Sequence, residues 1–213
     1  VCNVRMVPIA TEIITRELTG KESPVPALEE KVIPYYGVKE AAFPFNMFPE
    51  VDPLLGPEMR STGEVLGLSE SYGEAFYKAQ EAVQSKLPLS GTVLISVNRK
   101  DKAEVVEVAK LFHENNFRII ATEGTCQLIN EAGIPAEKVK KLCEGRPNVL
   151  DEITNGKVDI IVNSPVGKDS VYDDSYLRKA AIKGRIPYCT TMAAAMAAAT
   201  GIHAVNNLDG GKI

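Results

Sequence analysis

The stretch Val93-Leu94-Ile95-Ser96-Val97 decides the fold class, because it is a continuous apolar run that a helical pattern follows at once. Apolar residues between Val105 and Phe112 recur at helical spacing, and Asp101 and Glu104 are placed to cap that helix. An uninterrupted apolar strand is typical of a sheet that is covered on both faces. The stretch therefore predicts a buried parallel strand with its crossover helix.

The alternation of strands and helices continues downstream. The expected strands are 117–121, 139–142, 158–162 and 186–189, and the expected helices are 125–132, 149–155, 173–183 and an alanine-rich segment from 192. This order predicts an α/β fold, a Rossmann-like parallel sheet with helices on both faces. The tail 206–213 is expected to be loose.

Residues 1 to about 90 have a different pattern. Apolar residues from Ile9 to Leu18 form a helical stripe that ends at Gly20, and 38–45 reads as a strand. Two such elements cannot enclose a core, which indicates a piece of a larger domain. Ser71 and Glu74 form a capping-box pattern ahead of a connector helix. Frequent prolines in this region predict irregular stretches between short elements: Pro24, Pro26, Pro34, Pro44, Pro49, Pro53 and Pro57.

Composition excludes several classes of protein. The chain has 213 residues, 45% of them hydrophobic and 24% charged, which is ordinary for a globular domain. We expect a cytoplasmic protein, because no signal sequence and no apolar run of about 20 residues occur. A net charge of −4 without a basic block argues against nucleic-acid or membrane binding. Scattered cysteines favour free thiols over zinc or disulfides: Cys2, Cys126, Cys143 and Cys189.

Polar residues gather where the expected strands end. Ligands of open α/β sheets bind beyond the carboxyl ends of the strands, where helix N-termini present unpaired N–H groups. Hydroxyls, amides, glycines and two lysines at these ends predict a site for a phosphate-type anion, and Thr122-Glu123-Gly124-Thr125 is its sharpest element. The residues are Ser96, Asn98, Lys102, Thr122, Gly124, Thr125, Lys141, Asn163, Ser164, Gly167, Thr190 and Thr191.

Structural roles compete with this interpretation. Thr122 and Thr125 are equally suited to plain helix capping, Lys102 and Lys141 to solvated surface charges, and Asn163 to a strand cap. The convergence of five strand ends favours the anion site. Common nucleotide-hydrolase, dehydrogenase, esterase and metalloprotease motifs do not occur in the sequence. Five acidic residues are read as caps or surface groups: Glu40, Glu58, Glu64, Asp173 and Asp174.

Several motifs resemble the large chain of carbamoyl-phosphate synthase. The motifs that match the end of its second ATP-grasp region are Pro34-Tyr35-Tyr36-Gly37-Val38-Lys39-Glu40, Phe45-Asn46, Asp52-Pro53-Leu54-Leu55-Gly56-Pro57-Glu58-Met59 and Arg60-Ser61-Thr62-Gly63-Glu64-Val65. Those that match its methylglyoxal-synthase-like (MGS-like) regulatory domain are Ala121-Thr122-Glu123-Gly124-Thr125, Glu144-Gly145-Arg146-Pro147 and Ile161-Val162-Asn163. The resemblance implies an ATP-grasp remnant at 1–65, a connector helix at 66–90 and an MGS-like allosteric domain at 91–213.

The resemblance also implies a function. The whole enzyme makes carbamoyl phosphate from bicarbonate, ATP and glutamine-derived ammonia for pyrimidine and arginine synthesis. It uses ATP, Mg²⁺ and K⁺ and pairs with a glutamine amidotransferase small chain. This segment should hold no cofactor, metal or complete active site, and should join the rest of the large chain.

Effector sites follow from the same resemblance. UMP or IMP would bind at Ser96, Lys102, Thr122, Gly124, Thr125, Lys141, Asn163 and Thr191. Pro165 departs from the family pattern, which often carries a hydroxyl residue there. Part of an ornithine site is matched by Glu40, Tyr188 and Thr190.

Two alternative functions remain open. A methylglyoxal synthase, which eliminates phosphate from dihydroxyacetone phosphate, would use the same fold, but it needs a carboxylate base and a nearby histidine. Glu144-Gly145-Arg146-Pro147 occupies the stretch where that base is expected, and neither His113 nor His203 falls at the required place. Self-association as an oligomerisation module is the second alternative, and it does not explain the polar strand ends.

Overall fold

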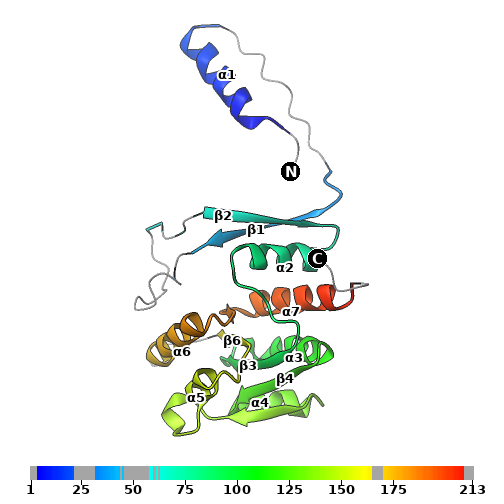
Figure 1. Ribbon diagram of the computed structural model, residues 1–213, viewed down its shortest axis with the longest axis vertical. Helices are drawn as coiled ribbons and strands as arrows, with labels where there is room; N and C mark the ends of the chain where they lie inside the picture. Colours follow the sequence, from blue (N-terminus) through cyan, green and yellow to red (C-terminus); the bar gives the residue numbers. More distant parts are fainter. Residues whose placement is uncertain are drawn as a thin grey trace.

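The computed structural model describes residues 4–21, 32–43, 45, 58–59, 61, 63–164 and 170–208. The N-terminal region comprises α1 (Met6–Leu18), β1 (Tyr36–Ala42), β2 (Gly63–Ser69) and α2 (Tyr72–Ala82) (Figure 1). Then follow β3 (Gly91–Val97), η2 (Asp101–Ala103), α3 (Val105–Glu114), β4 (Phe117–Thr122), α4 (Glu123–Glu131) and β5 (Ala136–Val139). The last elements are η3 (Leu142–Glu144), α5 (Val149–Thr154), β6 (Ile160–Ser164), α6 (Ser170–Gly184), β7 (Tyr188–Cys189) and α7 (Met192–Asn206).

Some predictions lie outside these residues. They concern Cys2, Pro24, Pro26, Pro44, the motif residues 46–57, 60 and 62, Pro165 and Gly167, and the end of the tail from 209.

Five strands form one parallel sheet with the order β5-β4-β3-β6-β7. The strand β3 lies at its centre, in register with β4 on one side and β6 on the other. Every residue of β6 is buried, as expected for a strand that is covered on both faces. The predicted parallel sheet is confirmed.

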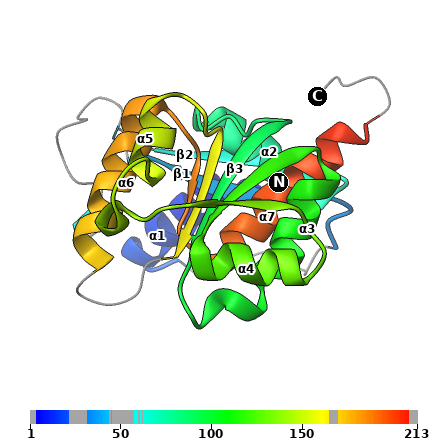
Figure 2. The same cartoon turned by 90° about the horizontal axis from the view of Figure 1, so that it is seen from below.

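Side chains of each strand alternate between two apolar cores. One core joins Val93 and Ile95 of β3 to α3, α4 and α7, and the other joins Leu94 to α5 and α6 (Figure 2). The prediction of helices on both faces is therefore confirmed. Burying one large apolar side chain stabilises the folded state by about 1.5–3 kcal/mol, so these cores are the main source of stability.

Two local predictions are wrong in detail. The strand expected at 139–142 is β5, which ends at Val139; a turn of 3₁₀ helix follows because the Glu144 carboxylate accepts a hydrogen bond from the Lys141 N–H at 2.9 Å. The Glu104 side chain makes no capping bond, since η2 precedes α3. The Asp101 carboxylate instead accepts a bond from the Asn98 amide at 2.6 Å.

The strand β2 was not predicted, and it forms an antiparallel pair with β1. The domain boundary predicted between 65 and 66 falls within β2, so secondary structure does not follow it, and the domain division stays a prediction. Figure 1 shows α2 lying between this strand pair and α7. Glycines permit the close approach: a Cβ on Gly67 would lie 2.0 Å from the Ala75 carbonyl oxygen, and one on Gly73 2.7 Å from that of Thr200.

The start of α2 confirms half of the predicted capping box. The Ser71 hydroxyl accepts a hydrogen bond from the Glu74 N–H at 3.2 Å. The Glu74 carboxylate does not close the box; it accepts a hydrogen bond from the Ser69 hydroxyl at the end of β2. The side chain thereby ties the helix to the strand pair on which it packs.

The predicted apolar stripe near the N-terminus is helical in α1. None of the residues of α1 is buried, and Val7 and Leu18 are 76% and 82% exposed. Such a face is suited to packing against further protein. Among the described helices, none combines the length and apolarity that a membrane span requires.

Candidate functional site

Three polar side chains form a row across neighbouring strands at the carboxyl edge of the sheet. Ser96 of β3 is in register with Asn163 of β6, and Thr122 lies at the end of β4. The alternation of side chains places all three on the face that carries α5 and α6. The Thr122 hydroxyl lies 3.5 Å from that of Ser96. The structure therefore brings together three of the residues that sequence analysis singled out.

The N-terminus of α4 lies at the end of this row. Thr122 is its N-cap residue, but its side chain makes no capping hydrogen bond, so plain capping does not account for this hydroxyl. Both Thr122 and Thr125 are buried, at 3% and 2% exposure. The Lys102 ammonium lies over Gly124, where an added Cβ would be 2.9 Å from Nζ. An ammonium beside the positive end of a helix is suited to an anion.

Three further residues predicted for the site do not belong to the row of Ser96, Thr122 and Asn163. Lys141 is exposed and lies two residues beyond Val139, the register partner of Thr122. The Thr191 hydroxyl accepts a hydrogen bond from the Ala194 N–H at 3.1 Å and so caps α7. Thr190 is exposed just after β7. Roles for these three in ligand binding stay predictions.

Asn163 does not simply cap a strand end, because it belongs to a buried polar network. Its amide nitrogen donates to an Asp174 oxygen at 2.7 Å and to the Tyr188 hydroxyl at 2.6 Å. The Tyr188 hydroxyl donates to the same Asp174 oxygen at 2.6 Å, and Arg178 forms an ion pair with the other oxygen. Burial raises the pKa of Tyr188, against an opposing effect of the Asn163 bond.

The expectation that Asp174 is a cap or surface group is wrong. Its side chain is buried, at 4% exposure for the residue, because α6 turns it toward the sheet and onto Arg178 one turn later. The i,i+4 spacing of these two residues was the available signal, but the same spacing is common in solvated ion pairs. Sequence analysis therefore missed Arg178 and the network.

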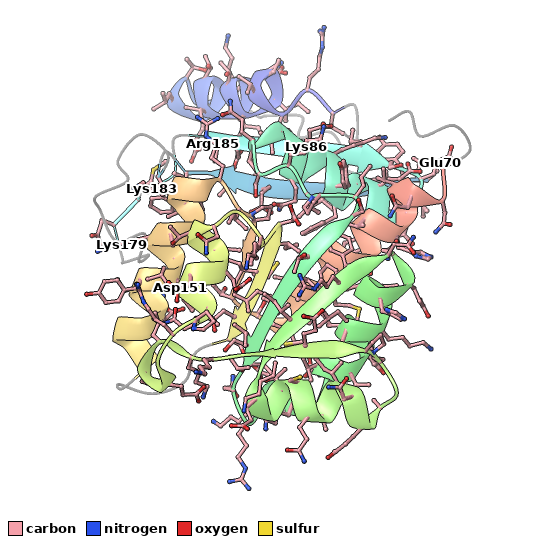
Figure 3. The ribbon with its side chains drawn as sticks, turned by 60° about the horizontal axis from the view of Figure 1, so that its bottom comes forward. Glu70, Lys86, Asp151, Lys179, Lys183 and Arg185 are labelled. Carbon is pink, nitrogen blue, oxygen red and sulfur yellow. The ribbon has the colours of Figure 1, made fainter. Side chains whose placement is uncertain are left out.

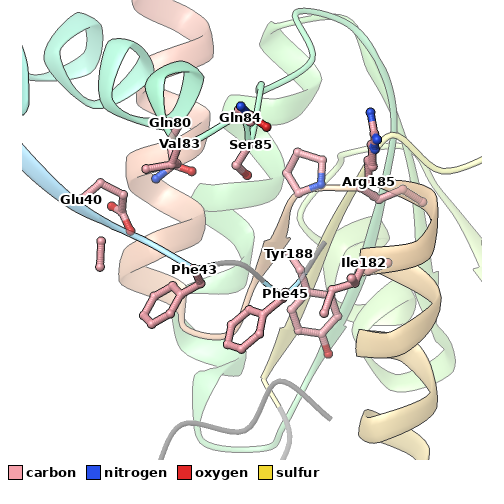
Figure 4. A pocket seen from close by; sticks show the side chains of 14 residues that line it. Glu40, Phe43, Phe45, Gln80, Val83, Gln84, Ser85, Ile182, Arg185 and Tyr188 are labelled. Atoms are coloured by element: carbon pink, nitrogen blue, oxygen red, sulfur yellow. The ribbon is translucent and has the colours of Figure 1, made fainter. Parts of the chain in front are cut away.

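A separate pocket of about 270 Å³ lies where β1, α2 and the end of α6 meet β7. Figure 4 shows Glu40 and Phe43 on one side of it and Tyr188 and Ile182 on the other. Burial raises the pKa of Glu40. Two of the three residues predicted for an ornithine site thus line one pocket, whereas Thr190 is not among the lining residues.

Three basic residues on or just after α6 do not belong to the buried network around Asn163. Figure 3 shows Lys179 and Lys183 on this helix and Arg185 just beyond its end. Arg185 also lines the pocket near Tyr188.

Within the ranges that the structure describes, no group of three or more His, Cys, Asp or Glu side chains is arranged to hold a metal ion.

Comparison with known proteins shows which family and which relatives this chain is similar to. Residues 104–190 match the MGS-like domain family. The carbamoyl phosphate synthase large chain of Acidobacterium capsulatum is 51% identical over 80% of this chain. The C-terminal section of the large chain of Methanopyrus kandleri is 43% identical over 93% of it.

The chain is homologous to the C-terminal section of carbamoyl phosphate synthase large chains. It spans 16% of the length of the Acidobacterium large chain and 38% of the Methanopyrus section. A solved methylglyoxal synthase from Elizabethkingia anophelis has a TM-score of 0.41 and 18% identity, covering 50% of this chain and 75% of that one. The large-chain homology extends over the N-terminal region as well, since the Methanopyrus match covers nearly the whole chain.

Proposed function

We propose that the carboxyl edge of the five-stranded sheet binds a nucleotide monophosphate, such as UMP or IMP, as an allosteric effector. The observation that carries this proposal is the Lys102 ammonium over Gly124, at the N-terminus of a helix whose N-cap side chain leaves its first N–H groups uncapped. Phosphate oxygens can accept from those N–H groups and from the ammonium together.

The row of polar side chains at the sheet edge is suited to hydrogen bonds with the ribose and base of a nucleotide. Hydroxyls of Ser96 and Thr122 can donate to or accept from a ligand. The nearby carboxylate of Asp174 is paired with Arg178, so it repels an anion less than an unpaired carboxylate would. Local groups thus provide anion affinity in a chain whose net charge is −4.

The regulated reaction is proposed from the homology. The effector would control the synthesis of carbamoyl phosphate from bicarbonate, ATP and glutamine-derived ammonia, a step toward pyrimidines and arginine. ATP, Mg²⁺, K⁺ and the glutamine amidotransferase small chain would belong to the whole enzyme. The pocket between Glu40 and Tyr188 would take ornithine, with the Glu40 carboxylate facing its cationic groups. Self-association and a cytoplasmic location stay predictions.

The histidines disfavour the alternative phosphate lyase. His113 lies in the last turn of α3 and His203 in the last turn of α7. Each helix is the first α-helix after a strand, and it runs back toward the opposite edge of the sheet. Both imidazoles are therefore distant from the row at the carboxyl edge, and neither is placed to assist proton transfer there.

Calorimetric titration of the chain with UMP and IMP tests the proposal. Lys102→Met should weaken nucleotide binding by about 10-fold or more, because one charge-assisted hydrogen bond is worth roughly 1.5–3 kcal/mol. Thr125→Val, which keeps the shape of a buried side chain, should also weaken it. Lys86→Met, at an exposed lysine, is the matched control and should leave affinity unchanged. A folded wild-type chain that binds neither nucleotide, or equal losses in both lysine variants, would contradict the proposal.

A further inference from the structure

We propose that Asp174, held by Arg178, is a positioning residue that fixes the amide of Asn163 in one orientation and links the sheet edge to the pocket beside Tyr188. The inference rests on the proposed function, because it assigns a specificity role within the same site. It is carried by the buried network of Asn163, Asp174, Tyr188 and Arg178.

Chemistry decides which end of the Asn163 amide faces the network. The Arg178 ion pair keeps Asp174 as a carboxylate, and a carboxylate can only accept hydrogen bonds. The group of Asn163 that lies 2.7 Å from it must therefore be the NH₂. We assign the second amide hydrogen to the Tyr188 hydroxyl, whose oxygen lies 2.6 Å from the amide nitrogen and which donates its own hydrogen to Asp174.

With this assignment both donors of Asn163 are used within the network, and only its carbonyl oxygen is left to bind a ligand. The phosphate group of a nucleotide is a monoester whose second pKa is about 6, so at pH 8 its oxygens only accept hydrogen bonds and cannot pair with that atom. A ribose hydroxyl or a base N–H can donate to it. Asn163 would consequently favour a ligand that carries such a donor in addition to phosphate, whereas Lys102 and the start of α4 provide affinity for phosphate alone.

Tyr188 extends this arrangement to the pocket. Its ring lines the pocket opposite Glu40, while its hydroxyl closes the hydrogen-bonded triangle with Asn163 and Asp174. A pocket ligand that displaces the ring would break both hydroxyl bonds and release one amide hydrogen of Asn163. Occupancy of the pocket would then alter the hydrogen-bonding character of the sheet edge, which is a direct route for coupling between two sites.

The first test compares two ligands in titrations of the whole chain at pH 8: UMP, and methyl phosphate, which has the same phosphate monoester group but no ribose or base. Tyr188→Phe removes only the hydroxyl, and it should lower the preference for UMP over methyl phosphate about 3- to 10-fold, the loss expected for one neutral hydrogen bond. The affinity for methyl phosphate should change little. Tyr176→Phe, at an exposed tyrosine of α6, is the matched control and should keep the preference. An unchanged preference in Tyr188→Phe, or an equal weakening of both ligands, would overturn the inference.

A second measurement needs no ligand. In side-chain amide NMR spectra, the Asn163 hydrogens should exchange with solvent at least about 10-fold more slowly than those of the exposed Asn116, and Tyr188→Phe should accelerate one of them. Equal exchange at the two asparagines in the wild type would overturn the positioning role. If the Asn163 hydrogens are slow but neither UMP nor methyl phosphate binds, the proposed function fails while the network stands as a structural feature.

Discussion

The two β-structures of this chain are stabilised in different ways. In the five-stranded sheet the strand β6 is buried at every residue, and helices cover both faces. In the two-stranded pair, β2 has a single buried residue, Gly67, and Leu66 is 48% exposed. The parallel sheet therefore contains its own core, whereas the pair depends on α2, which packs between it and α7. Homology to a longer large chain fits this difference, because apolar side chains of the pair and of α1 are exposed in this chain.

The largest expected effect distinguishes these two regions directly. Leu94→Ala removes a fully buried side chain from β3 and should lower the free energy of unfolding by about 2–5 kcal/mol. Leu66→Ala in β2 is the matched control, and at a half-exposed site it should cost well under about 1 kcal/mol. Guanidinium unfolding followed by circular dichroism measures both. Equal losses would contradict the view that the parallel sheet carries most of the stability.

A second substitution should detach the strand pair from its support. Gly67→Ala would place a methyl group 2.0 Å from the Ala75 carbonyl oxygen, so α2 must shift, at a cost of about 1–3 kcal/mol. We expect faster hydrogen exchange in β1 and β2 and unchanged protection in β3 and β6. Gly63→Ala lies in the same strand with nothing within 4 Å, and it should behave like the wild type. Protection that is unchanged in Gly67→Ala would show that α2 does not hold the pair.

The same contrast explains how far the sequence could predict the fold. Continuous apolar runs such as 93–97 are distinctive, so the parallel strands were found. The strand β2 was missed because it contains two glycines, Gly63 and Gly67, and glycine is unfavourable within a strand. The close approach of α2 that requires Gly67 is a tertiary contact, which the sequence does not show. The strand β5 was expected about one turn too late, at 139–142 instead of Ala136–Val139, and a local hydrogen bond from the Lys141 N–H to Glu144 forms a 3₁₀ turn where the strand was expected to continue.

The sequence likewise predicted one part of the site, the polar row, and missed another, the buried ion pair. Ser96, Thr122 and Asn163 could be placed together because the carboxyl ends of parallel strands meet at one edge of a sheet. The buried pair of Asp174 and Arg178 could not be distinguished from a solvated helix pair without knowing which face of α6 meets the sheet. Burial, rather than residue type, decides the role of such charges.

The smallest predicted effect concerns the edge strand β7. Burial raises the pKa of the Cys189 thiol from 9.0 to about 12. The folded state therefore holds the thiol proton more tightly than the unfolded state, and this stabilisation is lost as pH rises between these two values, by up to about 1.4 kcal/mol per pH unit. Urea unfolding between pH 8 and 10.5 should show a steeper decline for the wild type than for Cys189→Ala. Cys143→Ala, at an exposed thiol, should follow the wild type. A constant difference between wild type and Cys189→Ala would contradict the shift.

An NMR titration of the ¹⁵N-labelled chain with UMP tests the central claim most directly, because it reports which of the two regions receives the ligand. The account predicts saturable shifts that are largest for the backbone amides of Gly124 and Thr125, at the start of α4 beneath Lys102. Amides of Val38 and Leu66, in the strand pair, should move little. Shifts that are largest in β1 and β2, or that do not saturate, would contradict a nucleotide site at the carboxyl edge of the parallel sheet.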